Sequence, residues 1–127
     1  MLDRVLSDVD ENKSQSLEGL KEFLRIPSVS TNPANKQDVA RCADWLAGQL
    51  RGVGLSAVIH PTAGHPVILA KNEHRSDRAT VLFYGHYDVQ PPEPLELWTT
   101  PAFEPTVRKT EANTDAVYAR GAVDDKG

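Results

Sequence analysis

The sequence has little cysteine and no long apolar run. Its single cysteine, Cys42, excludes an internal disulfide framework, which is the usual support of small secreted domains. No uninterrupted apolar stretch is long enough to span a bilayer. The first residues also lack the basic and then apolar layout of a signal peptide. Together these absences predict a cytoplasmic protein without a membrane partner.

An excess of positive charge is also missing. The 127 residues hold 14 Lys and Arg against 18 Asp and Glu, which gives a net charge of −4. This balance argues against a nucleic-acid or anionic-membrane partner. The hydrophobic fraction of 39% and the charged fraction of 25% are ordinary for a soluble globular protein. The length suits one domain with a real core.

Helical periodicity dominates the first half of the chain. Apolar residues recur at three- and four-residue steps over residues 2–25, although the polar stretch 10–16 leaves two shorter helices open. A second apolar stripe predicts a helix over residues 37–51. Residues 55–60 and 66–71 follow as predicted strands joined by a turn.

The second half of the chain is predicted to be strands and loops. Residues 79–84 form an almost continuous apolar run, which is typical of a strand buried on both faces. Residues 91–105 hold five prolines and predict a stiff, ordered loop. Residues 103–109 and 116–119 predict a hairpin. Helices followed by such strands predict an α/β fold, a three-layer sandwich with a mixed, mostly parallel sheet.

His86 and Asp88 come directly after the predicted buried strand. Residues i and i+2 of an extended chain point the same way, so the two side chains can meet. An aspartate can hold one imidazole nitrogen while the other binds a metal ion. The end of a strand in an open α/β sheet is also where sites form. Taken alone, however, such a short pattern is more often a surface histidine near a surface aspartate.

Asp124 and Asp125 form a second candidate. Adjacent carboxylates in a charged turn fit the start of a helix, where negative charge is favoured. They also fit a two-metal hydrolytic site, in which one carboxylate bridges ions about 3.5–4 Å apart. Spacing alone leaves both interpretations open.

Several motifs read together resemble one family. They are Gly-His-Tyr-Asp-Val-Gln-Pro at residues 85–91, Leu-Trp at 97–98, Pro-Ala-Phe-Glu-Pro at 101–105 and Tyr-Ala-Arg-Gly-Ala-Val-Asp-Asp-Lys-Gly at 118–127. Ile-Pro-Ser-Val-Ser at 26–30 fits as well. The pattern resembles the di-zinc metallopeptidase family of aminoacylase, carboxypeptidase G, acetylornithine deacetylase and carnosinase (clan MH), and its dipeptidase branch in particular.

The resemblance implies a role for each acidic or histidine residue of these motifs. His86 is implied to be a zinc ligand, Asp88 the catalytic-site carboxylate that orients it, and Asp124 the bridge between two zinc ions. Mn²⁺ or Co²⁺ are the alternative metals. The family's cis peptide bond falls after the bridging aspartate, here between Asp124 and Asp125.

The resemblance also implies what the chain is part of. Residues 1–127 are expected to form the N-terminal portion of a catalytic domain, with the rest of that domain, the general-base glutamate and a dimerisation domain elsewhere. The implied parent is a homodimer that hydrolyses the peptide bond of dipeptides or short peptides. The alternatives are a deacylase of N-acyl amino acids and a non-catalytic truncated fragment.

Other reactive side chains have simpler interpretations. Cys42 lies on the apolar stripe of the second predicted helix and is expected to be a buried small hydrophobe. Trp98 is expected to be a packing anchor, with substrate contact as the alternative. Arg120 is expected to make a structural ion pair or to bind a substrate carboxylate. The remaining histidines are expected on the surface: His60, His65 and His74.

Overall fold

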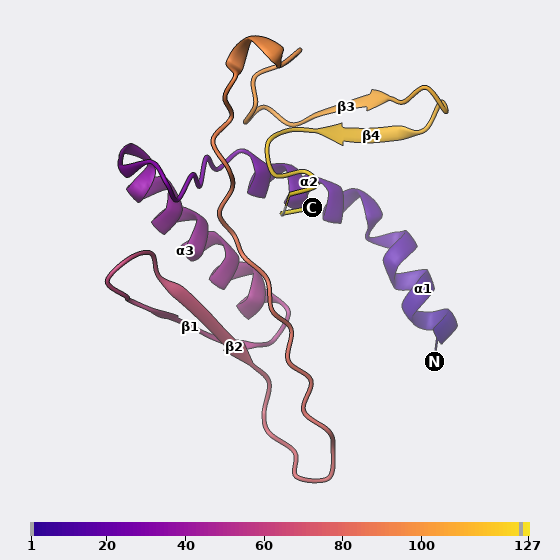
Figure 1. The fold of residues 1–127 in the computed structure, drawn as a ribbon. Helices are drawn as coiled ribbons and strands as arrows, with labels where there is room; N and C mark the ends of the chain where they lie inside the picture. The colour runs from indigo at the N-terminus through magenta and orange to yellow at the C-terminus, as the bar shows by residue number, and fades with distance from the viewer. Residues whose placement is uncertain (1, 125) are drawn as a thin grey trace.

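The computed structural model describes residues 2–124 and 126–127, and begins with helices (Figure 1). Helix α1 (Leu2–Glu11) and helix α2 (Lys13–Leu24) meet at Asn12, so the two-helix alternative is confirmed. The short 3₁₀ helix η1 (Pro33–Asn35) leads into helix α3 (Lys36–Gly52). Asn32 starts η1, because its side-chain oxygen accepts a hydrogen bond from the Ala34 N–H at 3.0 Å.

In the described part of the chain, four strands form two separate antiparallel hairpins. Strand β1 (Ser56–His60) pairs with β2 (Val67–Lys71), and Ala57 lies opposite Ala70. Strand β3 (Thr106–Lys109) pairs with β4 (Asp115–Tyr118) around a turn in which Asn113 has a positive φ of 59°. Asparagine tolerates this left-handed conformation better than most residues. Both predicted hairpins are confirmed, and every strand bound lies within three residues of its predicted position.

The core lies between α2, α3 and the first hairpin. In Figure 1 the β1–β2 hairpin lies along α3, and both of its strands contact that helix. The Phe23 and Trp45 rings stack at 4.7 Å and join α2 to α3. Buried apolar residues from these elements and from the two segments 26–29 and 89–102 complete the core: Leu24, Ile26, Val29, Val39, Cys42, Ala43, Ala47, Ala57, Val89 and Ala102.

The prediction of a buried strand over residues 79–84 is wrong. These residues are in no strand, and Leu82, Phe83 and Tyr84 are 87%, 90% and 92% exposed. They lie in the long extended excursion that leaves the body of the molecule after β2 (Figure 1). A strand buried on both faces needs neighbouring strands and covering layers, and the described part of the chain supplies neither to this segment.

The α/β class is confirmed, but the described residues contain little parallel pairing. Their strands form the two antiparallel hairpins, and parallel pairing is limited to the bridge between Val29 and Val89. The mostly parallel sheet is therefore not assembled by this part of the chain alone. None of the helices in the described ranges is long and apolar enough to cross a membrane.

Gly121 follows β4 and packs closely against the Val89 side chain. Its φ is +88°, a conformation that side chains other than glycine rarely adopt. A Cβ added there would also lie 2.8 Å from Val89 Cγ1 and 3.5 Å from Leu24 Cδ2. Both the backbone conformation and the packing therefore require glycine.

Substituting Gly121 should destabilise the chain for both reasons. We expect Gly121→Ala to lower the free energy of unfolding by about 1–3 kcal/mol, through backbone strain and the clash with Val89. Gly48→Ala is the matched control, because Gly48 lies in α3 with open space around it. That change should instead stabilise by about 0.5–1 kcal/mol. Urea denaturation of both variants measures the difference, and equal effects would contradict this account of Gly121.

Candidate metal centre

Residues 26–30, which follow α2, are hydrogen-bonded to the segment that carries His86 and Asp88. The Val89 N–H donates to the Ser28 carbonyl oxygen at 3.0 Å, and the Ser28 hydroxyl donates to the Tyr87 carbonyl oxygen at 2.7 Å. Ser28 is fully buried, so these hydrogen bonds are shielded from water. Because the residue before a proline disfavours the helical conformation, the helix ends ahead of Pro27, and the backbone groups of Ser28 remain available for this pairing.

Tyr87 fixes the same segment to the first hairpin and to α3. Its hydroxyl donates to the Pro66 carbonyl oxygen, and its own carbonyl oxygen also accepts from Cys42 Sγ at 3.4 Å. Burial raises the pKa of Tyr87 to about 12, with smaller contributions from Cys42 and Asp88. Burial likewise raises the pKa of the Cys42 thiol, and Cys42 is fully buried, as predicted.

His86 and Asp88 lie in contact on the open side of this segment. His86 Nδ1 is 3.1 Å from Asp88 Oδ1, and the side chains are 41% and 38% exposed. The second carboxylate oxygen, Oδ2, accepts a hydrogen bond from the Ser30 hydroxyl. Because Ser30 holds one oxygen of Asp88, the other is left facing the imidazole. The structure thus brings together two of the three predicted site residues.

His65 is not the bare surface histidine that was expected. It is half-buried, and its Nε2 lies 2.8 Å from the Ser30 carbonyl oxygen. The hairpin turn between β1 and β2 therefore supports the residue that holds Asp88. His60 and His74 are exposed, as expected.

Asp124 is exposed in the turn that follows Gly121. Across residues 2–124 and 126–127, no three His, Cys, Asp or Glu side chains gather in a group that could hold a metal ion. Among these described residues, Asp124 therefore forms no such group with His86 and Asp88. The predicted cis bond between Asp124 and Asp125 lies outside the described residues.

Lys126 anchors the turn that carries Asp124. Its Nζ donates to the carbonyl oxygens of Phe23 and Ile26, each at 2.8 Å. Burial lowers the pKa of Lys126, while Cys42 and Asp88 act in the opposite direction. A lysine at the carboxyl end of a helix is favoured by the helix dipole and satisfies carbonyl groups that lack partners.

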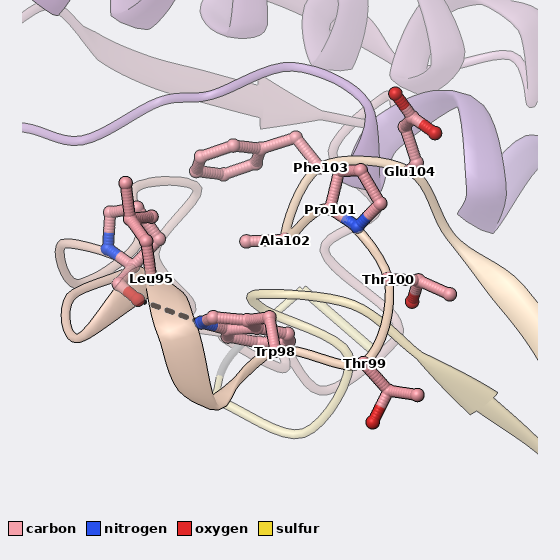
Figure 2. A pocket seen from close by; sticks show the side chains of 9 residues that line it. Leu95, Trp98, Thr99, Thr100, Pro101, Ala102, Phe103 and Glu104 are labelled. Atoms are coloured by element: carbon pink, nitrogen blue, oxygen red, sulfur yellow. Dashed lines mark hydrogen bonds between the residues drawn. The ribbon is translucent and has the colours of Figure 1, made fainter.

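An open hollow lies beside the proline-rich loop (Figure 2). Trp98 is half-buried, its Nε1 donates to the Pro92 carbonyl oxygen at 2.7 Å, and Arg120 lies over its ring at 5.2 Å. Trp98, Ala102 and Phe103 face an open hollow of about 620 Å³. Two contacts thus hold Trp98 in place, as expected of a packing anchor. Among the described residues, the contact found for Arg120 is cation–π and not the expected ion pair.

Sequence reasoning missed three side chains whose long-range hydrogen bonds join these segments: Ser28, Ser30 and Lys126. Serine in a loop and lysine in a charged turn are ordinary surface residues by type, so nothing in their identity marks them. Their signal was positional, because Ser28 and Ser30 belong to the motif at 26–30 and Lys126 to the motif at 118–127.

Comparison with known proteins agrees with these motifs. Residues 82–127 match the model of peptidase family M20/M25/M40. The match includes His86, Asp88, Asp124 and Lys126, and the resemblance to the metallopeptidase family is thereby confirmed.

Individual relatives can then be named. Cys-Gly metallodipeptidase DUG1 of Candida albicans is 29% identical over 139 residues, covering 99% of this chain and 28% of that protein. Succinyl-diaminopimelate desuccinylase of Thiobacillus denitrificans is 38% identical over 89 residues, covering 70% of this chain and 21% of that protein. The solved structure of the dipeptidase Dug1p from Saccharomyces cerevisiae superposes with a TM-score of 0.82 at 30% identity, covering 99% of this chain and 28% of that one. The chain thus spans less than a third of the length of these relatives.

Alkaline titration tests the burial of Tyr87. The pKa of Tyr87 is raised from 10 to about 12, so the folded state favours the neutral phenol. The stability that this gives is fully present below pH 10 and is lost as the pH rises through 12. We expect phenolate absorbance to show a late step near pH 12 that Tyr87→Phe removes. Tyr84→Phe should leave that step in place, because Tyr84 is 92% exposed. A single shared step near pH 10 would contradict the structure.

Proposed function

We propose that this chain is the N-terminal portion of the catalytic domain of a metal-dependent dipeptidase. The observation that carries the proposal is the contact between His86 Nδ1 and Asp88 Oδ1 at 3.1 Å, on a segment held by buried hydrogen bonds. The family match over residues 82–127 and the dipeptidase relatives support it. A small peptide is the proposed substrate, and the cytoplasmic address remains a prediction from composition.

The donor set of the His86–Asp88 pair fits a zinc ion. An imidazole whose Nδ1–H donates to a carboxylate is fixed in orientation and made more basic at Nε2, the nitrogen that would bind the metal. Asp124 would supply a carboxylate to both ions of a two-metal centre. When bound, zinc supplies a Lewis acid that polarises the scissile carbonyl group.

The residues of this chain hold and orient rather than complete the reaction. Asp88 keeps the His86 ring in one orientation, and Ser30 keeps the Asp88 carboxylate turned toward that ring. Each zinc ion needs about four ligands, more than His86 and Asp124 can provide. The other ligands and the general base that moves the proton are expected from the part of the relatives' length that this chain does not span.

Replacing His86 tests the proposed ligand. In the complete protein that carries this chain, His86→Ala should lose one metal ion and reduce dipeptide hydrolysis below detection. Asp88→Asn should weaken metal binding by about 10–100-fold, because it removes the charge that orients the ring. His74→Ala is the control, since His74 is an exposed histidine in the segment after β2. Calorimetric zinc titration measures all three, and two tightly bound ions in His86→Ala would refute the assignment.

The second candidate is a deacylase of N-acyl amino acids, and the similarity to succinyl-diaminopimelate desuccinylase favours it. We expect the complete protein to have a higher kcat/KM for a dipeptide such as Cys-Gly than for a succinylated amino acid. A preference for the succinylated substrate would replace the dipeptidase proposal by the deacylase one.

A further inference from the structure

Lys126 is a buried cation in a molecule whose other lysines are not buried. Lys126 is buried, whereas the Lys109 side chain, on the hairpin that precedes the same turn, is 59% exposed. Removing an ammonium group from water is costly unless its hydrogen-bond donors find acceptors. The position of the Lys126 ammonium group is therefore set by the groups that accept its hydrogen bonds.

Those groups belong to the end of helix α2. Lys126 Nζ donates to the Phe23 and Ile26 carbonyl oxygens at 2.8 Å each and lies 4.5 Å from the centre of the Phe23 ring. Two directed hydrogen bonds and a ring face define one position for the ammonium group. An apolar side chain could fill the same space but would not define it.

The backbone of Lys126 closes the turn that bears Asp124. The Lys126 N–H donates to the Gly121 carbonyl oxygen at 2.9 Å, and the Gly127 N–H donates to the same oxygen at 3.2 Å. Gly121 in turn packs against Val89, where an added Cβ would come within 2.8 Å of Cγ1. A shift of Lys126 would therefore move the base of this turn.

Residues 26–28 also bind the segment that carries the His86–Asp88 pair. Ile26 accepts Lys126, while Ser28, two residues later, pairs with Tyr87 and Val89 on either side of Asp88. Both the Asp124 turn and the segment of the His86–Asp88 pair are thus hydrogen-bonded to residues 26–28. Figure 1 shows the carboxyl end of the chain lying beside α2.

We propose that Lys126 is a positioning residue of the metal centre, which sets the place of Asp124 relative to His86 through the end of helix α2. The proposal rests on the proposed function, since it assumes that Asp124 and His86 serve the same pair of metal ions. In this role the ammonium group of Lys126 binds the end of helix α2 and is not itself a metal ligand. It acts through the turn closed on Gly121.

The test replaces Lys126 in the complete protein. Lys126→Met keeps an unbranched side chain of similar length and removes both hydrogen bonds and the charge. We expect zinc affinity to fall by about 10–100-fold, as for other residues that orient ligands. At saturating zinc, kcat should fall at least as much as kcat/KM. In the metal-free protein, the Lys126 and Gly127 amides should lose protection from hydrogen exchange.

Two controls separate positioning from general stability. Lys109→Met removes an exposed ion pair with Asp115 on the neighbouring hairpin and should leave zinc affinity unchanged. Val39→Ala creates a gap in the α3 core and should lower Tm without changing the number of zinc ions bound. Lys126→Arg keeps charge and donors and should restore part of the zinc affinity lost in Lys126→Met.

The outcomes distinguish this inference from the proposed function. Wild-type zinc affinity and kcat in a folded Lys126→Met protein would overturn the positioning role while leaving the dipeptidase proposal intact. If Lys126→Met does not fold, Lys126→Arg is measured in its place. Loss of zinc binding in that variant, with unchanged protection of the amides of residues 126 and 127, would also overturn the role. A wild-type protein that binds no zinc would instead defeat the proposed function itself.

Discussion

Two hydrogen bonds join the segment after α2 to the segment that carries the His86–Asp88 pair, and the candidate centre depends on them. The Ser28 hydroxyl and carbonyl oxygen pair with Tyr87 and Val89, and Ser28 is fully buried. A hydrogen bond of this kind contributes about 0.5–1.5 kcal/mol net, but leaving a buried partner unsatisfied costs about 1–3 kcal/mol. The pairing therefore fixes the register between two segments that are far apart in sequence.

Other side chains around the pair also form hydrogen bonds between segments that are far apart in sequence. Ser30 holds one oxygen of Asp88, and His65 lies against the Ser30 carbonyl group. Lys126 reaches the same region from the far end of the chain through Ile26. Three loops thus converge on the end of one helix, which explains how side chains can be placed without a complete sheet.

The motifs carried more information than the hydrophobic pattern did. His86 and Asp88 could be singled out because their spacing predicts side chains on one side of an extended segment. The helices and both hairpins could be predicted because their periodicity and turn residues act locally. Residues 79–84 could not, because an apolar run shows that burial suits a segment but does not supply the neighbours that bury it.

The sequence by itself determined the α/β class, the two hairpins, the buried Cys42 and the family resemblance, since each follows from local pattern or from motifs read together. Only the tertiary structure decided which side chains support the candidate centre. Ser28, Ser30 and Lys126 are unremarkable by type, and their roles arise from acceptors as far as 103 residues away along the chain. Long-range hydrogen bonds of this kind depend on how the segments pack, which no local periodicity encodes.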